Sequence, residues 1–354
     1  MTKIFLIRHA EAEGNLYRSA HGQSEGLITP RGHVQIRQLE QRFADEKIDA
    51  VYSSDLIRAK VTATAVAGPR GLPINTTEKL REVCMGEWEE LAWGDIERNY
   101  PELCKTFGLD PANWHVEGSE AYEDVISRVN DFITEAAQKH DGGTIALFCH
   151  GFAIRSFFCR LMGYASNESI KLPYCDNTAV ALLLYDGGKF TIEFQSDNSH
   201  LSEEESTFAQ QKWWRDEGMR VTETENMRYE ALDGERDAML LEALGKEIGV
   251  KPSAEFEFTT FLGDEPVGLL GISMADASAG KLNYIFLLPD FHKEKFGVQL
   301  IGKAITEFRK KKIQFLRFEA QKENPFVWLC KKHGFEAVSE TGGIVLLEKD
   351  IRNW

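Results

Sequence analysis

The sequence predicts an α/β protein with a mostly parallel, helix-covered sheet in its N-terminal half and a mixed α/β domain in its C-terminal half. Three apolar runs, residues 4–7, 48–53 and 144–149, each end in charged or reactive residues and are followed by a helical pattern. The 354 residues exceed what a single hydrophobic core usually serves. We therefore expect domains at residues 1–201 and 219–354.

The first strand is the run Ile-Phe-Leu-Ile at residues 4–7, which leads directly to Arg8 and His9. A continuous apolar run bounded by charge indicates a strand that is buried on both faces, as in a parallel sheet. Ligands of such sheets bind beyond the carboxyl ends of the strands. Arg8 and His9 would therefore stand at the binding edge.

The second strand, residues 48–53, leads to Arg58 in the first turns of a predicted helix. Ser54 or Asp55 is the residue type that caps a helix N-terminus, so we expect one of them to begin this helix.

The third strand, residues 144–149, ends at His150, and Gly151 would allow a tight turn into a helix at 152–162. Two arginines and two histidines would thus share one sheet edge. Guanidinium groups bind phosphate bidentately, and a histidine held at one ring nitrogen can attack phosphorus with the other. The surrounding cations would stabilise the transferred phosphoryl group, and this scheme requires no metal.

Five motifs in this order resemble the histidine phosphatase, or phosphoglycerate mutase-like, superfamily. The motifs are Arg8-His9-Ala10-Glu11 with Asn15, Leu27-Ile28-Thr29-Pro30-Arg31-Gly32 with Gln35, Ser54-Asp55-Leu56 with Arg58-Ala59, Leu80-Arg81-Glu82 with Gly86 and Trp88-Glu89, and His150-Gly151. The resemblance implies a three-layer α/β/α domain. Ala10 departs from the glycine that is common in the family.

By this resemblance, His9 would be the phosphorylated nucleophile, and Arg8, Arg58 and His150 would bind the transferred phosphate. Glu82 would protonate the leaving oxygen and then activate water. A carboxyl group beside an anionic phosphate has a raised pKa, which suits an acid. The implied substrate-binding residues are Asn15, Gly22, Gln23, Trp114, His115 and Gly151. The implied substrate is a small phosphomonoester.

Three departures from phosphoglycerate mutases favour hydrolysis. Met85 stands where mutases have tyrosine, Trp93 where they have lysine, and Phe152 where they usually have asparagine. Each change removes a polar contact to a small acidic substrate. Mutase-type phosphotransfer remains the alternative.

Strands at 179–185 and 190–195, joined by Asp-Gly-Gly, are expected to close the sheet as a hairpin. Ser202 and the acidic residues after it are typical of a helix start, which predicts a helical linker over 202–218. The expected elements beyond it are strands at 227–231, 256–262, 267–272, 281–287, 314–320 and 343–348, an Asp233-capped helix through Leu244, and helices at 297–309 and 325–332.

This order of elements resembles the GNAT superfamily of N-acetyltransferases, which implies acetyl-CoA as cofactor. The implied cofactor-binding residues are Leu287, Phe296, Gly297, Val298, Asn324 and Cys330. The phosphate-binding loop keeps only its last glycine, and cysteine replaces the tyrosine that often protonates the coenzyme thiolate. An active acyltransferase, a coenzyme-binding module and a structural relic all remain open.

The composition limits the partners. The chain has 41 Lys and Arg against 56 Asp and Glu, a net charge of −15, which argues against nucleic acid as a partner. The six cysteines show no CxxC spacing and read as reduced cytosolic thiols, and no apolar run is long enough to span a bilayer. We expect a cytoplasmic protein with no membrane partner, and homodimerisation is left open.

Three functions from different classes follow. The first is a metal-independent phosphomonoesterase, and the second is an acyltransferase whose phosphatase half is accessory. The third is a sensor that binds a phosphorylated metabolite without turnover. Glu82 argues against the sensor, because a binding site needs no proton donor.

Overall fold

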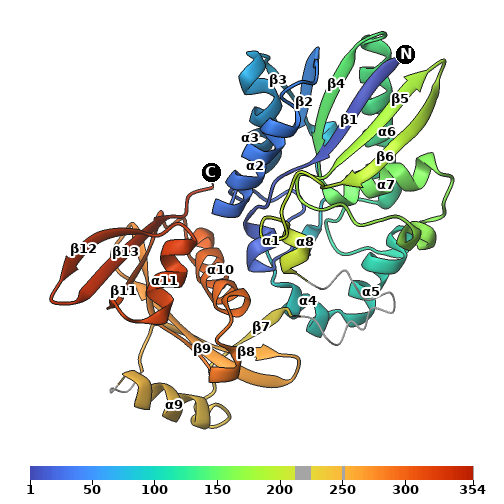
Figure 1. Cartoon of the computed structure of the whole chain (residues 1–354). Helices are drawn as coiled ribbons and strands as arrows, with labels where there is room; N and C mark the ends of the chain where they lie inside the picture. Colours follow the sequence, from blue (N-terminus) through green and yellow to red (C-terminus); the bar gives the residue numbers. More distant parts are fainter. Residues whose placement is uncertain (212–224, 249–251, 354) are drawn as a thin grey trace. The chain divides into compact units, whose positions relative to one another are not determined.

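Residues 1–211, 225–248 and 252–353 are described by a computed structural model of the chain (Figure 1). The chain divides into two compact units. Unit 1 is Met1–Asn15, Ala20–Glu89 and Tyr100–Met219, and unit 2 is Leu16–Ser19, Glu90–Asn99 and Arg220–Trp354. Of the predicted linker, residues 212–218 lie outside the described residues, and its first part contains the short helix α8 (Thr207–Gln210).

Unit 1 is built on a six-stranded mixed sheet with the strand order β3-β2-β4-β1-β5-β6. The strands are β1 (Thr2–Arg8), β2 (Ala50–Ser54), β3 (Ile74–Thr77), β4 (Thr144–Cys149), β5 (Val180–Asp186) and β6 (Lys189–Asp197). The first four in sheet order run parallel, and β5 pairs antiparallel with both β1 and β6. The expected hairpin forms through Gly187 and Gly188, which both adopt positive φ angles.

Helices cover both faces of this sheet (Figure 1). The helices of unit 1 are α2 (Pro30–Arg42), α3 (Ile57–Ala67), α5 (Pro101–Leu109), α6 (Tyr122–Lys139), α7 (Gly151–Leu161) and α8, and α1 (Glu13–Tyr17) begins in this unit. Leu39 of α2 and Ala63 of α3 share a core with Phe5 of β1. Because side chains alternate along a strand, Ile4 and Leu6 face the opposite layer, where α6 packs on α7, and both are fully buried.

The predicted cap of α3 is wrong. The N-cap residue is Leu56, which makes no side-chain capping bond, rather than Ser54 or Asp55. The first helical N–H, that of Ile57, donates instead to the Glu25 carboxylate at 2.8 Å. A carboxylate from a distant loop therefore satisfies the positive helix end, and no local pattern could reveal it.

Unit 2 contains a seven-stranded sheet with the strand order β12-β13-β11-β10-β9-β8-β7. Its strands are β7 (Met227–Ala231), β8 (Phe256–Leu262), β9 (Glu265–Met274), β10 (Ala279–Leu287), β11 (Phe315–Gln321), β12 (Glu336–Thr341) and β13 (Ile344–Asp350). All neighbours are antiparallel except β10 and β11, which pair in parallel over four residues. We did not anticipate the exposed edge strand β12.

The helices of unit 2 are α4 (Trp93–Asn99), α9 (Ala238–Ile248), α10 (Glu294–Lys310) and α11 (Pro325–Lys332). Helices α10 and α11 share one hydrophobic core with the sheet, whereas α9 packs on Leu269, Tyr284 and Phe286 in a second cluster. Asp233 accepts hydrogen bonds in a turn before α9, which begins at Ala238, so the predicted cap of α9 is displaced.

Short 3-10 helices complete the described chain at Gly68–Arg70, Glu78–Leu80, Gly86–Trp88, Pro111–Asn113, Ser166–Lys171 and Pro289–Phe291. Within the ranges that the structure describes, no helix combines the length and the apolar character needed to cross a bilayer.

Candidate active site

The carboxyl ends of parallel strands bring the predicted phosphate-binding residues together in unit 1. His9 follows β1, His150 follows β4 as the N-cap of α7, and Arg58 lies in the first turn of α3. The imidazole rings of the two histidines have centroids 5.1 Å apart. Residues far apart in the sequence therefore converge, because one edge of the sheet collects the ends of neighbouring parallel strands.

His9 is held in the tautomer that a nucleophile needs. Its Nδ1 lies 2.7 Å from the backbone oxygen of Ala10. Since a carbonyl oxygen only accepts, Nδ1 carries the hydrogen and Nε2 keeps its lone pair. Burial, and then the charges of Arg58 and Arg8, hold the pKa of His9 well below its usual value. His9 is therefore a neutral, oriented imidazole at neutral pH.

Arg58 is fixed by a loop that contains two of the predicted substrate-binding residues. The guanidinium group of Arg58 is buried and donates to the backbone oxygens of Gly22 at 2.6 Å and Ser24 at 2.9 Å. The Glu89 carboxylate in turn accepts from the backbone N–H groups of Gly22, Gln23 and Ser24 at 2.7 to 3.1 Å. Glu89 belongs to the fourth motif of the sequence, but the motif alone does not indicate that it orders this loop.

Arg8 and His150 present buried polar atoms without partners among the described residues. Arg8 donates through Nη1 to the backbone oxygen of Cys175, but its Nε is unpaired, as are both ring nitrogens of His150. Burial, followed by the charge of Arg58, holds the pKa of His150 well below its usual value. Each unpaired buried group costs about 1–3 kcal/mol, so their grouping around a neutral histidine points to an anionic ligand.

Gly151 permits the close approach of α7 to Arg8. A Cβ atom at this position would lie 3.2 Å from Arg8 Nε, closer than an ordinary van der Waals contact. The structure therefore places Gly151 against Arg8, the arginine predicted to bind phosphate, as a residue that makes room for it.

The Glu82 carboxyl group lies at the beginning of α7. Its two oxygens accept from the backbone N–H groups of Phe152 and Ala153, each at 3.0 Å. Burial raises the pKa of Glu82, and this effect outweighs the lowering by these N–H groups and by Arg58. A carboxyl group with a raised pKa at the start of the helix that His150 caps suits a proton donor.

Arg128 of α6 fixes the segment that carries Glu82, and we did not identify it from the sequence. Its guanidinium group donates to the backbone oxygens of Arg81 at 2.6 Å and Glu82 at 3.0 Å, and pairs with the Glu120 carboxylate. An arginine in an amphipathic helix carries no signal for such a role, since only the fold brings it to this loop.

Asn15 and Asn177 are the remaining polar residues near the backbone of His9. The Asn177 amide donates to the backbone oxygen of His9 at 2.9 Å and to Asn15 Oδ1 at 3.3 Å. Asn15 Oδ1 also accepts from the N–H of Ala12. The structure therefore places Asn15 close to the loop that follows His9, and it adds Asn177, which the sequence analysis missed.

The other predicted substrate-binding residues differ in their surroundings. Trp114 is buried and packs against Phe107 and Trp88, with ring centroids 4.8 and 5.4 Å away. His115 is exposed, and its Nδ1 lies 3.2 Å from the Ser119 hydroxyl oxygen. Trp114 thus has the contacts of a packing anchor, and its role towards a substrate stays a prediction, as does that of His115.

In unit 2, three of the predicted cofactor-binding residues lie in the core. Leu287, Phe296 and Val298 are buried within one hydrophobic cluster. Gly297 lies inside α10 rather than before it, and a Cβ there would come within 2.7 Å of a methyl group of Leu329. This glycine therefore allows the close packing of two helices.

The other two residues also have structural contacts. Asn324 is the N-cap of α11, and its side chain accepts from the N–H of Phe326 at 2.9 Å. Cys330 is fully buried, and burial raises the pKa of its thiol to about 12. The backbone oxygen of Leu287 is engaged by His292 Nε2 at 2.6 Å. In the described ranges, neither unit has a cluster of three His, Cys, Asp or Glu residues arranged to hold a metal ion.

Comparison with known proteins identifies the class of unit 1. Residues 4–198, more than half of the chain, match the histidine phosphatase superfamily (branch 1), so the chain belongs to this superfamily. The fold and the grouping of His9, His150 and the two arginines agree with that membership.

Two curated relatives of known name match the N-terminal part of the chain. Phosphoserine phosphatase 1 of Hydrogenobacter thermophilus is 28% identical over 57% of this chain and 96% of its own length. Phosphoglycerate mutase-like protein 4 of Arabidopsis thaliana is 32% identical over 57% of this chain and 87% of its own length. These relatives support phosphatase activity.

Solved structures agree with the fold of unit 1. The Bacillus stearothermophilus YhfR structure superposes with a TM-score of 0.55 at 28% identity, covering 56% of this chain and 99% of that one. A mutant phosphoserine phosphatase from Entamoeba histolytica, in complex with phosphoserine, gives a TM-score of 0.51 at 25% identity over 57% of this chain and 100% of its own.

Proposed function

We propose that unit 1 is a metal-independent phosphomonoesterase that acts through a phosphohistidine formed on His9. The observation that carries this proposal is the state of His9, a neutral imidazole whose Nδ1–H is bound to Ala10 and whose Nε2 lone pair is available. Two arginines and an unpaired His150 surround it. The domain that belongs to the superfamily contains all of these residues.

In the first step, His9 Nε2 attacks the phosphorus atom and the bond between phosphorus and the ester oxygen breaks. Glu82, whose pKa is raised, gives its proton to the departing oxygen, so that the product leaves as an alcohol. Arg8, Arg58 and His150 stabilise the negative charge on the non-bridging oxygens.

In the second step, the Glu82 carboxylate takes a proton from water, which attacks the phosphorus atom of the phosphohistidine. The nitrogen–phosphorus bond breaks, inorganic phosphate leaves, and His9 returns to its neutral form. Glu82 thus serves as acid in the first step and as base in the second. Its proton moves to the leaving oxygen in the first step, and a proton returns to it from water in the second.

Hydrolysis of a small phosphomonoester is favoured over mutase-type transfer by the residues near Glu82. The backbone N–H of Phe152 holds the Glu82 carboxylate, and its ring stacks on Phe107 with centroids 5.3 Å apart. Met85 is buried. Apolar groups at these positions offer no polar contact to a carboxylated substrate. A panel of phosphorylated metabolites that includes phosphoserine and 3-phosphoglycerate tests this choice.

A phosphoenzyme trap tests the mechanism. Wild-type chain mixed with p-nitrophenyl phosphate and quenched in alkali should carry one phosphoryl group, which is stable in base and labile in acid, on His9 by peptide mass spectrometry. The same activity should persist in a chelator. Phosphate found on another residue, or turnover that a chelator abolishes, would contradict the proposal.

For unit 2 we propose a GNAT-like fold, supported by its strand order and by the short parallel pairing of β10 with β11. Two of the residues expected to bind acetyl-CoA have contacts that suit a structural role instead, because Gly297 lets two helices pack closely and Cys330 is a buried, weakly acidic thiol. Thiol release from acetyl-CoA with a panel of amines, measured in the full chain, would establish an acyltransferase if it exceeds the rate without protein.

A further inference from the structure

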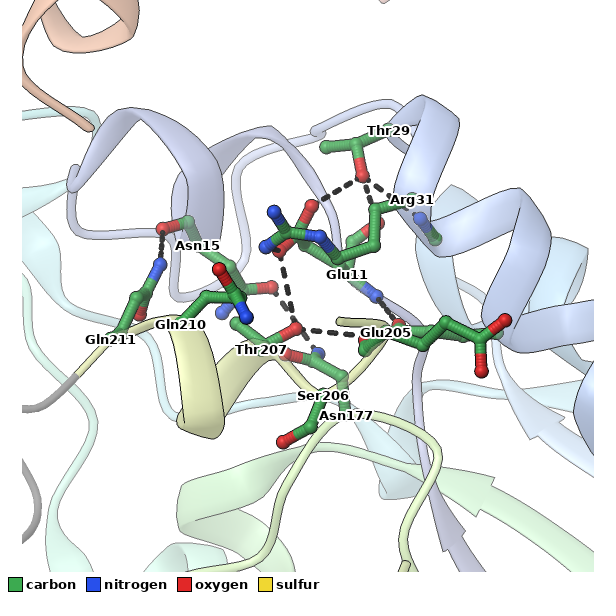
Figure 2. A network of polar contacts seen from close by, with 12 residues as sticks. Glu11, Asn15, Thr29, Arg31, Asn177, Glu205, Ser206, Thr207, Gln210 and Gln211 are labelled. Carbon is green, nitrogen blue, oxygen red and sulfur yellow. Dashed lines mark hydrogen bonds and ion pairs between the residues drawn. The ribbon is translucent and has the colours of Figure 1, made fainter. Parts of the chain in front are cut away.

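Four residues that follow the matched family domain contact either the loop that carries the proposed nucleophile or Asp176, which precedes Asn177. Ser206, Thr207, Phe208 and Gln211, which we call the tether residues, lie in unit 1 beyond residue 198, where the family match ends. Figure 2 shows this segment beside Glu11 and Asn15, which belong to the chain after β1. The segment that follows the matched domain therefore makes polar contacts with the chain that follows β1.

The first contact is between Thr207 and the buried carboxylate of Glu11. This carboxylate is 1% exposed and accepts from the Thr29 hydroxyl at 2.6 Å, from Arg31 at 3.1 Å and from the Thr207 hydroxyl at 3.2 Å (Figure 2). The Gln35 amide donates to Thr207 Oγ1, and its oxygen accepts from the N–H of Glu11. A buried carboxylate needs such donors, so Thr207 helps to hold the second residue after the nucleophile.

The second contact passes through Asp176, which is 2% exposed. Its carboxylate accepts from the Ser206 hydroxyl at 2.6 Å and from the N–H of Phe208 at 3.2 Å. Ser206 and Phe208 therefore fix the carboxylate of Asp176. The next residue, Asn177, holds the backbone of His9, because its amide donates to the backbone oxygen of His9.

The third contact reaches two phosphate-binding groups. The Gln211 amide donates to the backbone oxygen of Asn15 at 2.8 Å. The ring of Phe208 faces the guanidinium group of Arg8, whose carbon lies 5.8 Å from the ring centroid. Both ends of the loop from Arg8 to Asn15 are thus in contact with the tether residues.

We propose that the tether residues are positioning residues of the phosphatase site, which hold Arg8 and Asn15 where they bind the phosphoryl group beside His9. This inference rests on the proposed function of unit 1. Its physical reason is that a displacement of a binding group by a fraction of an ångström weakens phosphate binding, while the fold around it persists. The segment that continues to unit 2 would thereby affect phosphate affinity.

Inorganic phosphate is the probe, and full-length chains are compared by calorimetric titration and by competitive inhibition of p-nitrophenyl phosphate hydrolysis. Gln211→Ala removes the donor to Asn15 and should weaken phosphate binding by roughly three- to tenfold, the effect of one hydrogen bond. Gln210→Ala is the matched control, since the Gln210 amide donates to the backbone oxygen of Glu203 on the exposed side. This control should leave the phosphate affinity unchanged.

A second pair of variants, both at Thr207, distinguishes a positioning role from a role in folding alone. Thr207→Val removes the hydroxyl donor and should weaken phosphate binding, whereas Thr207→Ser keeps the hydroxyl and should restore it. A purely structural role would lower the fraction of folded, active chains but leave the affinity of each folded chain unchanged. Equal phosphate affinity in wild type, Gln211→Ala and Thr207→Val would overturn the inference. A wild-type chain that neither binds nor releases phosphate would instead overturn the proposed function on which it rests.

Discussion

The sites of units 1 and 2 were both predicted from a short motif at the end of a strand, but the surroundings of the predicted residues differ between the two units. In unit 1, the chain gathers buried polar groups, of which Arg8 Nε and both nitrogens of His150 lack partners among the described residues. In unit 2, Phe296 and Val298 lie in the hydrophobic core, and Asn324 caps a helix. Among the described residues of the two predicted sites, only those of unit 1 include buried polar atoms without partners that a ligand would satisfy.

This difference shows which kind of motif predicts chemistry. Arginine and histidine are costly to bury, so their gathering at one sheet edge needs a compensating ligand. Glycine, asparagine and apolar residues near a helix start have ordinary structural uses, and each has one in unit 2. The predictions below test this contrast from the largest expected effect to the smallest.

The largest effect is expected for His9→Ala. Loss of the nucleophile should lower kcat/KM for p-nitrophenyl phosphate by roughly 10⁴-fold or more, because His9 supplies the oriented lone pair beside the unpaired groups of Arg8 and His150. His33→Ala, on the exposed side of α2, is the matched control and should retain wild-type turnover. Steady-state assays of the two variants decide the point. Substantial hydrolysis by His9→Ala would assign the chemistry elsewhere.

Glu82→Gln should slow the reaction in a way that depends on the leaving group. With an alkyl phosphate, kcat/KM should fall by about 10²- to 10⁴-fold, since the departing alkoxide needs a proton. With p-nitrophenyl phosphate the fall should be smaller, because p-nitrophenolate leaves readily as an anion.

The pH profile of Glu82→Gln gives a second measurement of the same role. The pKa of Glu82 is raised, so wild-type kcat/KM for the alkyl ester should decline as pH rises through that pKa. The Glu82→Gln profile should lack this decline. An equal loss with both substrates would contradict the assignment of Glu82 as acid.

The two buried histidines should make the chain less stable in mild acid. Their pKa values lie well below the usual 6.5, so below pH 6.5 the unfolded chain binds protons that the folded chain does not. The free energy of unfolding should therefore fall as pH decreases from 6.5, by up to about 1.4 kcal/mol per pH unit for each histidine.

Denaturant unfolding monitored between pH 7 and pH 5 measures this slope. The double variant His9→Gln with His150→Gln should show a shallower dependence, because the other groups with shifted pKa values, such as His200 and Glu82, would still contribute but these two histidines would not. An identical slope in the variant would mean that these histidines are not the source.

The smallest effect is expected in unit 2 for Gly297→Ala. The added methyl group would meet Leu329 at 2.7 Å, so crowding of about 1–3 kcal/mol should exceed the gain in helix propensity of about 1 kcal/mol. The unfolding midpoint of unit 2 should therefore decrease. A Cβ atom at Gly108 in α5 would meet no other atom. Gly108→Ala should therefore stabilise the chain slightly. A change in acetyl-CoA affinity without loss of stability would favour a cofactor role for Gly297.

Much of the fold could be predicted because it follows local patterns. The apolar runs that became β1, β2 and β4 and the Gly-Gly hairpin between β5 and β6 were identified from hydrophobic periodicity and turn residues. Edge strands β3 and β12 were missed, because their side chains are largely exposed and lack an apolar pattern. The cap of α3 was missed because Glu25 reaches it from a distant loop.

The sequence by itself determined the reactive residue types and their places after strands: Arg8 and His9, Arg58, and His150. Only the tertiary structure decided the tautomer of His9, the low pKa of both histidines and the raised pKa of Glu82, because burial and neighbouring charges set them. It also supplied Glu89, Arg128, Asn177 and the tether residues, whose contacts join segments far apart in the chain. Hydrogen bonds between distant segments leave no local pattern, which is why these residues could not be found from the sequence.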